Sequence, residues 1–279
     1  MPVPKTFERK DWNLDFRSEL YKHEFYATDA WAKRRDGLVS PWDDSTRDEL
    51  RRLRCLKEKE RPTHVGEIIR EQDGAALVRS WYELLDINSD THPRTAELLY
   101  ATMYLAGSVA TFFKDRFHRA RPVTLAPDLA PPIPTPQLPA YPGGHATQIY
   151  LMALTLVHLH PNREDEILHC AEQVARNRER AGVNYPSDSE AGRKLAQDIL
   201  PILTSECELF RTTLNEAAAE DDASTEARVY SQIQRMAESL VKGSAEHDAS
   251  LETRVYSQIL RVAERLAKGS ESFAGGRTS

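Results

Sequence analysis

The segment KDRFHRARP (residues 114–122), together with YPGGH (residues 141–145) and RERAGVNYPSD (residues 178–188), decides how this chain folds. Each segment adjoins a run in which many apolar residues recur three or four positions apart, the spacing of a buried helix face. These runs occupy residues 95–117, 146–160, 164–180 and 189–214. We therefore expect core helices joined by the three polar segments.

The flanking sequence is also helical in character, and no stretch alternates polar and apolar residues as a strand would. Apolar positions at helical spacing recur in residues 11–38, 46–56, 65–71 and 75–85. Residues 123–142 hold seven of the sixteen prolines, which predicts an irregular loop that forms one wall of a substrate entrance. The expected fold class for residues 1–214 is all-α, a helical bundle.

Local signals suggest where these helices begin, continue and bend. If the helix over residues 95–117 continues to Arg121, the Lys114 and Arg121 side chains lie on one face, two turns apart. Ser187 or Asp188 is expected to cap the last core helix. A kink is expected at Pro201 within that helix, because proline disrupts the hydrogen-bond ladder.

Composition indicates a water-soluble globular protein: 279 residues, of which 40% are hydrophobic and 29% charged. The net charge of -6 and the interleaving of basic with acidic residues give no reason to expect a nucleic-acid partner. The three cysteines have no metal-ligand spacing, so reduced thiols are expected. Without a signal-like amino terminus or an apolar run of about 20 residues, we expect a cytoplasmic protein with no transmembrane segment.

The carboxyl-terminal residues 215–279 differ in composition and contain a repeat. Residues 223–244 and 249–270 match at most positions, and each has a narrow apolar stripe at helical spacing. The stripes comprise Val229, Ile233, Met236 and Leu240, and then Val255, Ile259, Val262 and Leu266. Because a short amphipathic helix cannot bury such a stripe alone, we expect a linker followed by two helices that pack on the domain or dock on a protein partner.

The order and spacing of the three polar segments resemble the motifs of the type 2 phosphatidic acid phosphatase and vanadium haloperoxidase superfamily. Those motifs are Lys, six residues and Arg-Pro; then Pro-Ser-Gly-His; then Arg, five residues, His, three residues and Asp. The resemblance is confined to residues 114–188 and departs from the motifs at Gly143 and Asn184. It implies a helical bundle of that family's type and a phosphoric ester hydrolase that needs no metal or other cofactor.

By this resemblance, three basic residues bind the oxygens of a phosphate group: Lys114, Arg121 and Arg178. Guanidinium groups hold such oxygens bidentately, and lysine acts as a point charge. Gly143 and Gly144 bring backbone amides to the anion at a helix amino terminus. Because Gly143 replaces a serine, one hydroxyl donor is missing and weaker oxyanion binding is expected. His145 is the general acid, with an expected pKa near neutrality.

Asn184 occupies the position of the family's histidine, which forms a phosphohistidine in phosphatases and binds vanadate in haloperoxidases. An amide nitrogen is not basic, and an amide is a poor metal ligand beside imidazole. Asp188, which in the family orients that histidine, is retained and is left with no imidazole to orient. The catalytic set implied by the resemblance is therefore His145, Asn184 and Asp188, with the nucleophile position inactivated.

Asn184 has two competing interpretations: a substitution that traps substrate, or a natural pseudoenzyme that binds a phosphorylated ligand. We favour the first, because a single change to histidine completes the motif. The rival activities are a vanadate-dependent haloperoxidase, with vanadate as cofactor, and a non-catalytic phosphate-binding or scaffold-recruited protein. The expected ligand is a phosphorylated small molecule, phosphate or vanadate.

Overall fold

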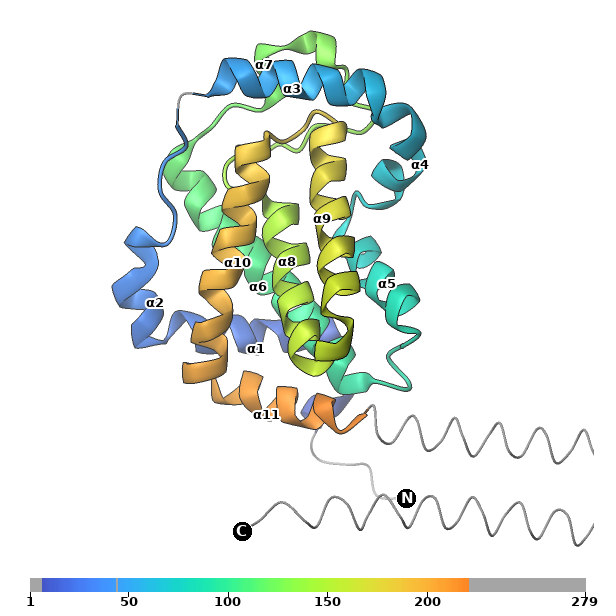
Figure 1. The fold of residues 1–279 in the computed structure, drawn as a ribbon. Helices are drawn as coiled ribbons and strands as arrows, with labels where there is room; N and C mark the ends of the chain where they lie inside the picture. The colour runs from blue at the N-terminus through green and yellow to red at the C-terminus, as the bar shows by residue number, and fades with distance from the viewer. Residues whose placement is uncertain (1–6, 44, 221–279) are drawn as a thin grey trace, which may run out of the picture. The chain divides into compact units, whose positions relative to one another are not determined.

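The computed structural model describes residues 7–43 and 45–220, and these residues form helices and no strand (Figure 1). The all-α prediction is confirmed. The helices are α1 (Leu14–Tyr26), α2 (Asp29–Arg34), α3 (Thr46–Lys59), α4 (Arg61–Arg70), α5 (Gly74–Leu85), α6 (Pro93–Phe117), α7 (Pro122–Leu125), α8 (Gly144–Leu159), α9 (Glu164–Arg180), α10 (Pro186–Glu206) and α11 (Glu208–Ala218).

Helix α8 lies at the centre of the bundle and packs against α6, α9 and α10, while α1 crosses α6 (Figure 1). The central position of α8 follows from its sequence. Its own apolar residues occupy most sides of the helix, and such a helix must be covered by other helices. The polar residues of α9 restrict its buried face to one stripe, which faces α8. The three polar segments therefore lie next to the helices that form the core.

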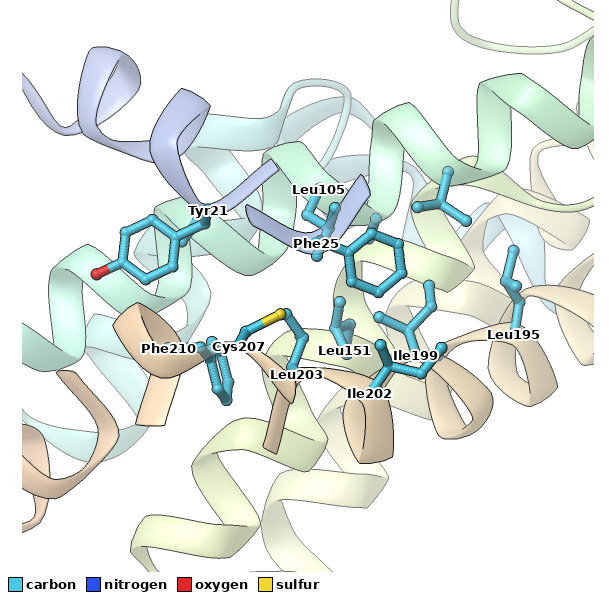
Figure 2. Close-up of a cluster of buried hydrophobic side chains, with 14 of the residues drawn as sticks. Tyr21, Phe25, Leu105, Leu151, Leu195, Ile199, Ile202, Leu203, Cys207 and Phe210 are labelled. Atoms are coloured by element: carbon cyan, nitrogen blue, oxygen red, sulfur yellow. The ribbon is translucent and has the colours of Figure 1, made fainter. Parts of the chain in front are cut away.

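The largest buried apolar cluster joins the two ends of the described chain (Figure 2). Its members come from α1, α6, α8, α10 and α11, with Cys207 between the last two helices, and include Tyr21, Phe25, Leu105, Leu151, Leu195, Ile199, Ile202, Leu203, Cys207 and Phe210. Burying an aliphatic or aromatic side chain of this size stabilises a fold by about 1.5–3 kcal/mol. Helix α11 is thus held by the same core as α1.

Helices α8 and α10 approach each other closely at Gly192. A β-carbon at this position would lie 2.6 Å from the Gly143 carbonyl oxygen and 2.8 Å from the Ala146 β-carbon. Only a residue without a β-carbon permits this separation of the two helices. Gly192 therefore holds the amino end of α10 against the glycine motif at the start of α8.

In the part of the chain that the structure describes, one segment, Pro93–Leu125, is long and apolar enough to cross a membrane by length and composition alone. The apolar window within it is 67% buried inside the fold, so most of its side chains contact other helices of this chain.

The first compact unit runs to Ala217, three residues beyond the expected residue 214, and Ala217 packs in the core. As expected, the helix continues past Pro201: α10 runs to Glu206. The helix predicted over residues 189–214 is interrupted at Cys207, between α10 and α11. Both predicted repeats lie outside the described residues.

Candidate functional site

The predicted site residues gather at one end of the bundle, where the amino ends of α8 and α10 meet the carboxyl end of α9 (Figure 1). Helices α3 and α7 cross this end. The loop over residues 126–143 connects α7 to α8, with a short 3-10 turn at Pro127–Leu129 and otherwise irregular backbone, as its prolines predict. Contacts between this loop and the three polar segments build the site.

Lys114 holds the loop in place through all three donors of its ammonium group. Its Nζ donates to the carbonyl oxygens of Pro139 at 2.7 Å, Ala140 at 2.9 Å and Pro142 at 2.6 Å. Burial, and then the positive charge of Arg121, lower the Lys114 pKa to about 7. Lys114 therefore has no free N–H group with which to make the expected direct contact to an anion. In this arrangement it can act on an anion only through its charge.

Arg121 reaches the site although it is not on the same helix as Lys114. Helix α6 ends at Phe117, and His118 adopts a left-handed conformation with φ of 51°. The two cations therefore do not share a helix face, as a continuous helix would have required. Arg121 donates from Nε to the Leu138 carbonyl at 2.8 Å and from Nη1 to the Val183 carbonyl at 2.8 Å. It thus ties the loop to the turn after α9.

Asn184 is fully engaged by its neighbours. Its Oδ1 accepts from Arg121 Nη1 at 3.2 Å, and its Nδ2 donates to the Ala140 carbonyl at 3.1 Å and to Asp188 Oδ2 at 3.3 Å. Asp188 is therefore not left without a group to orient. It also accepts from the Tyr185 backbone N–H at 2.7 Å, so it caps α10 from inside the first turn, while Tyr185 occupies the N-cap position.

Arg119 supports the candidate site but was not singled out from the sequence, although it lies within the first polar segment. The residue is 4% exposed, and its guanidinium donates to Asp188 Oδ1 at 2.7 Å and to Glu49 at 2.6 Å. It also stacks on the Tyr185 ring, with its central carbon 3.8 Å from the ring centroid, a favourable cation–π geometry. Glu49 comes from α3 and carries no motif that could have indicated this role.

Burial raises the pKa of Asp188, and the charge of Arg119 opposes that rise. The Arg119–Asp188 pair is almost completely enclosed, with side-chain exposures of 3% and 0%. A buried pair of this kind is strongly destabilised when one partner is removed. Arg119 therefore fixes the carboxylate that holds Asn184.

The two glycines differ in what their backbone amides can do. The Gly143 N–H donates to the Asp188 carbonyl at 2.8 Å, so it is not available to an anion. A β-carbon on Gly143 would lie 2.8 Å from that same carbonyl oxygen, which leaves no room for the serine that the family motif places there. Gly144 begins α8 close to Lys114 Cε, and the first N–H groups of a helix have no intrahelical partner.

Arg178 is a buried cation without a hydrogen-bond partner. Its side chain is on α9 and is 5% exposed, and its Nε is enclosed and unpaired. Among the described residues, no hydrogen bond or ion pair reaches any of its nitrogen atoms. Burial, and then the nearby charge of Arg121, lower its pKa to about 10. The Glu71 carboxylate attracts the guanidinium and opposes this shift, and the guanidinium stays charged at neutral pH.

His145 lies in the first turn of α8 and contacts the turn between α4 and α5. Its Nε2 is 3.1 Å from the Gln72 carbonyl oxygen, and because a carbonyl can only accept, Nε2 carries the proton. Burial of the ring and then the charges of Arg178 and Arg121 lower its pKa to about 3. The expectation of a pKa near neutrality was therefore wrong for the anion-free site, where the imidazole is neutral at pH 7.

Comparisons with known proteins add no relatives: no protein-family model matches this chain, and no curated protein matches it. Within the part of the chain that the structure describes, no group of three or more His, Cys, Asp or Glu side chains is arranged to hold a metal ion.

Proposed function

We propose that this domain binds a phosphate-like tetrahedral oxyanion, in a site of the acid phosphatase and vanadium haloperoxidase type whose nucleophile position holds Asn184. The observation that carries the proposal is the guanidinium of Arg178, a residue 5% exposed, whose enclosed Nε has no hydrogen-bond partner. A buried polar group without a partner is costly, and a doubly charged oxyanion would supply the missing acceptors. Two parallel hydrogen bonds from one guanidinium to two oxygens suit such a ligand.

The charges around Arg178 support an anion rather than a neutral ligand. Burial first, and then the charge of Arg121, lower the pKa of both Lys114 and Arg178, while Asp188 and Glu71 oppose these shifts. The three cations therefore repel one another. A bound dianion converts this repulsion into attraction. The amides at the start of α8 add donors and a favourable helix dipole.

Binding of the anion would also prepare His145 for proton transfer. The charges of Arg178 and Arg121 help to keep the imidazole neutral, and neutralising them removes part of that effect and raises the pKa. Once protonated, His145 can donate to the oxygen of a leaving alcohol. Besides the serine hydroxyl missing at Gly143, this site then lacks the group that attacks phosphorus.

The contacts of Asn184 suggest how a histidine would be placed there. Its Nδ2 donates to Asp188, and the Nδ1–H of an imidazole can make the same bond. The free electron pair on Nε2 would then face the anion as a nucleophile. Attack would form an N–P bond while the ester P–O bond breaks, the leaving oxygen would take its proton from His145, and water would later cleave the phosphohistidine.

The test compares the parent protein with the Asn184→His variant. Binding of inorganic phosphate is measured by calorimetry for both proteins, and release of phosphate is measured on a panel of phosphate esters that includes p-nitrophenyl phosphate. We expect phosphate binding in both proteins. Turnover of at least one ester should increase by about 10⁴ or more in the variant, the scale on which catalysis depends on a nucleophile.

The other outcomes are equally informative. If neither protein binds phosphate and Asn184→His hydrolyses no ester, the proposal is refuted. Oxidation of bromide or chloride by peroxide in the presence of vanadate, without ester hydrolysis, would reassign the site to a haloperoxidase. Phosphate binding in both proteins without turnover in Asn184→His would retain the anion site and reject the hydrolase.

A further inference from the structure

The turn between α4 and α5 contacts the anion site through His145. The Nε2–H group of His145 donates to the Gln72 carbonyl oxygen of this turn at 3.1 Å. Glu71, the residue before Gln72, is the C-cap of α4 and is partly buried. Its carboxylate attracts the guanidinium of Arg178 on α9. Glu71 is therefore an acid that lies near two of the residues assigned to the anion site.

Asn177 holds the Glu71 carboxylate in position. Its Nδ2 donates to Glu71 Oε2 at 3.0 Å and to Glu67 Oε2 at 3.3 Å, so both N–H groups of the amide are used. Asn177 is 1% exposed, and its Oδ1 accepts from Arg180 Nη1 at 2.8 Å. Because the amide is buried and bonded through both polar atoms, the carboxylate that it holds has a defined orientation.

The other oxygen of the Glu71 carboxylate is unused. Among the residues that the structure describes, Glu71 Oε1 makes no hydrogen bond and Glu71 forms no ion pair. Oε1 is not one of the enclosed atoms of the fold, so solvent reaches it. An oriented carboxylate oxygen that is accessible and has no protein partner is open to a hydrogen-bond donor of a ligand.

The charges that act on Glu71 have both signs. Burial raises the pKa of its carboxyl and the Asn177 hydrogen bond lowers it; the charge of Glu67 then raises the pKa, and the charges of Arg70 and Arg178 lower it. Neither arginine makes an ion pair with Glu71 in the described part of the chain. Arg178 and Glu71 therefore attract each other without a direct bond. A ligand that accepts from the guanidinium and donates to the carboxylate would connect them.

Building on the anion site proposed above, we propose that Glu71 selects an oxyanion that carries a proton. The ionised oxygens of the anion accept from Arg178, and its hydroxyl group donates to Glu71 Oε1. An ionised carboxylate can only accept hydrogen bonds, so an anion without a proton meets Glu71 with lone pairs and negative charge alone. The site therefore binds phosphate, which keeps a proton at neutral pH, in preference to sulfate, which does not. Among phosphate monoesters, the form that fits is the monoanion, which also keeps one proton.

The experiment measures the Kd of inorganic phosphate and of sulfate for the full chain by calorimetry, at about pH 8, above the second ionisation of a phosphate group. Both ions are then dianions of similar shape that differ by one proton, so the effect of the surrounding cations is common to both. We expect phosphate to bind at least about tenfold more tightly than sulfate, because a hydrogen bond to a charged group is made by one ion only.

Glu71→Gln tests the residue itself. A glutamine amide keeps an oxygen that can accept from Asn177 and gains N–H donors that suit either ion, so phosphate and sulfate should bind about equally. The matched control is Glu67→Gln, which changes the other acid held by Asn177 and should keep the preference for phosphate. Thermal melting confirms that each variant is folded. If Glu71→Gln does not fold, Glu71→Ala decides, since it also removes the acceptor for the proton.

The inference is overturned if the parent protein binds phosphate and sulfate equally well, or if a folded Glu71→Gln variant keeps the preference of the parent. Loss of the preference in Glu67→Gln would also overturn it, because the selection would not belong to Glu71. Arg178→Met separates this inference from the site on which it rests. Equal binding of the two ions in the parent, with both weakened in Arg178→Met, would retain the anion site and reject the role of Glu71; binding of neither ion to the parent would reject both.

Discussion

Replacing Arg178 by methionine should make the anion-free protein more stable. The guanidinium is 5% exposed and has no hydrogen-bond partner, and leaving a buried polar group unsatisfied costs about 1–3 kcal/mol. Methionine fills a similar space with an adaptable apolar chain. For a domain of this size, recovering that free energy corresponds to a rise in melting temperature of about 3–9 °C. Calorimetry in phosphate-free buffer measures this change.

Phosphate should reverse the order of stability. A ligand at a hundred times its Kd stabilises the folded state by about 2.7 kcal/mol, and we expect this gain in the parent protein and a much smaller one in Arg178→Met. The matched control is Arg121→Met, since Arg121 is also buried but donates to Leu138, Val183 and Asn184. Each acceptor left unpaired costs about 1–3 kcal/mol, so this variant should be less stable with or without phosphate.

The result that refutes this reasoning is an Arg178→Met variant that melts below the parent protein in phosphate-free buffer. The attraction between Arg178 and the Glu71 carboxylate would then outweigh the cost of burying the guanidinium. Equal stabilisation of both proteins by phosphate would place the anion elsewhere. A rise in melting temperature combined with loss of phosphate stabilisation is the pattern of a residue kept for binding at the expense of stability.

Three further predictions concern pH and packing. Burial and nearby cations lower the pKa of His145 from 6.5 to about 3. The unfolded chain therefore binds the proton more readily, and the free energy of unfolding falls as pH drops from 6.5 toward about 3. His145→Gln should flatten the pH dependence of urea denaturation over this range. Arg61→Met should lower the free energy of unfolding by at least about 3 kcal/mol. The buried Arg61 guanidinium donates to the carbonyls of residues 129, 130, 180 and 181, which this variant leaves unpaired. The control Arg51→Ala should change the free energy of unfolding by less than about 0.5 kcal/mol. Gly192→Ala should destabilise the fold by at least about 1–3 kcal/mol, since its β-carbon would lie 2.6 Å from the Gly143 carbonyl oxygen. The control Gly66→Ala places its β-carbon with no atom within 4 Å. It should stabilise the exposed part of α4 by about 0.5–1 kcal/mol.

Helix periodicity was sufficient to predict the secondary structure around the site. The range predicted for α9, residues 164–180, is the observed one, and α6 begins two residues before its predicted start. These helices are long and have continuous apolar faces, which is the signal that local sequence carries best. Helix interruptions were less predictable: the chain leaves α6 at His118, and the helix predicted over residues 189–214 is interrupted at Cys207.

The chemical character of the site residues could be predicted from their types. Whether each side chain is free to bind a ligand or to take up a proton could not. A lysine at position 114 supplies N–H donors, yet only the fold shows that three loop carbonyls occupy them. A histidine at 145 normally titrates near neutrality, yet burial and neighbouring charges lower its pKa. The same distinction applies to Arg178, whose lack of a partner is a property of its surroundings.

By itself, the sequence determined an all-helical domain, the positions of its long helices and the set of polar residues that could bind an anion. These follow from apolar spacing and side-chain chemistry, which act over a few residues. Only the tertiary structure decided that Arg119 and Glu49 support Asp188, that Gly143 has no room for a side chain, and that Arg178 is buried without a partner. Those properties depend on how distant segments exclude water and supply or withhold hydrogen-bond partners, and neither is encoded within a single local stretch.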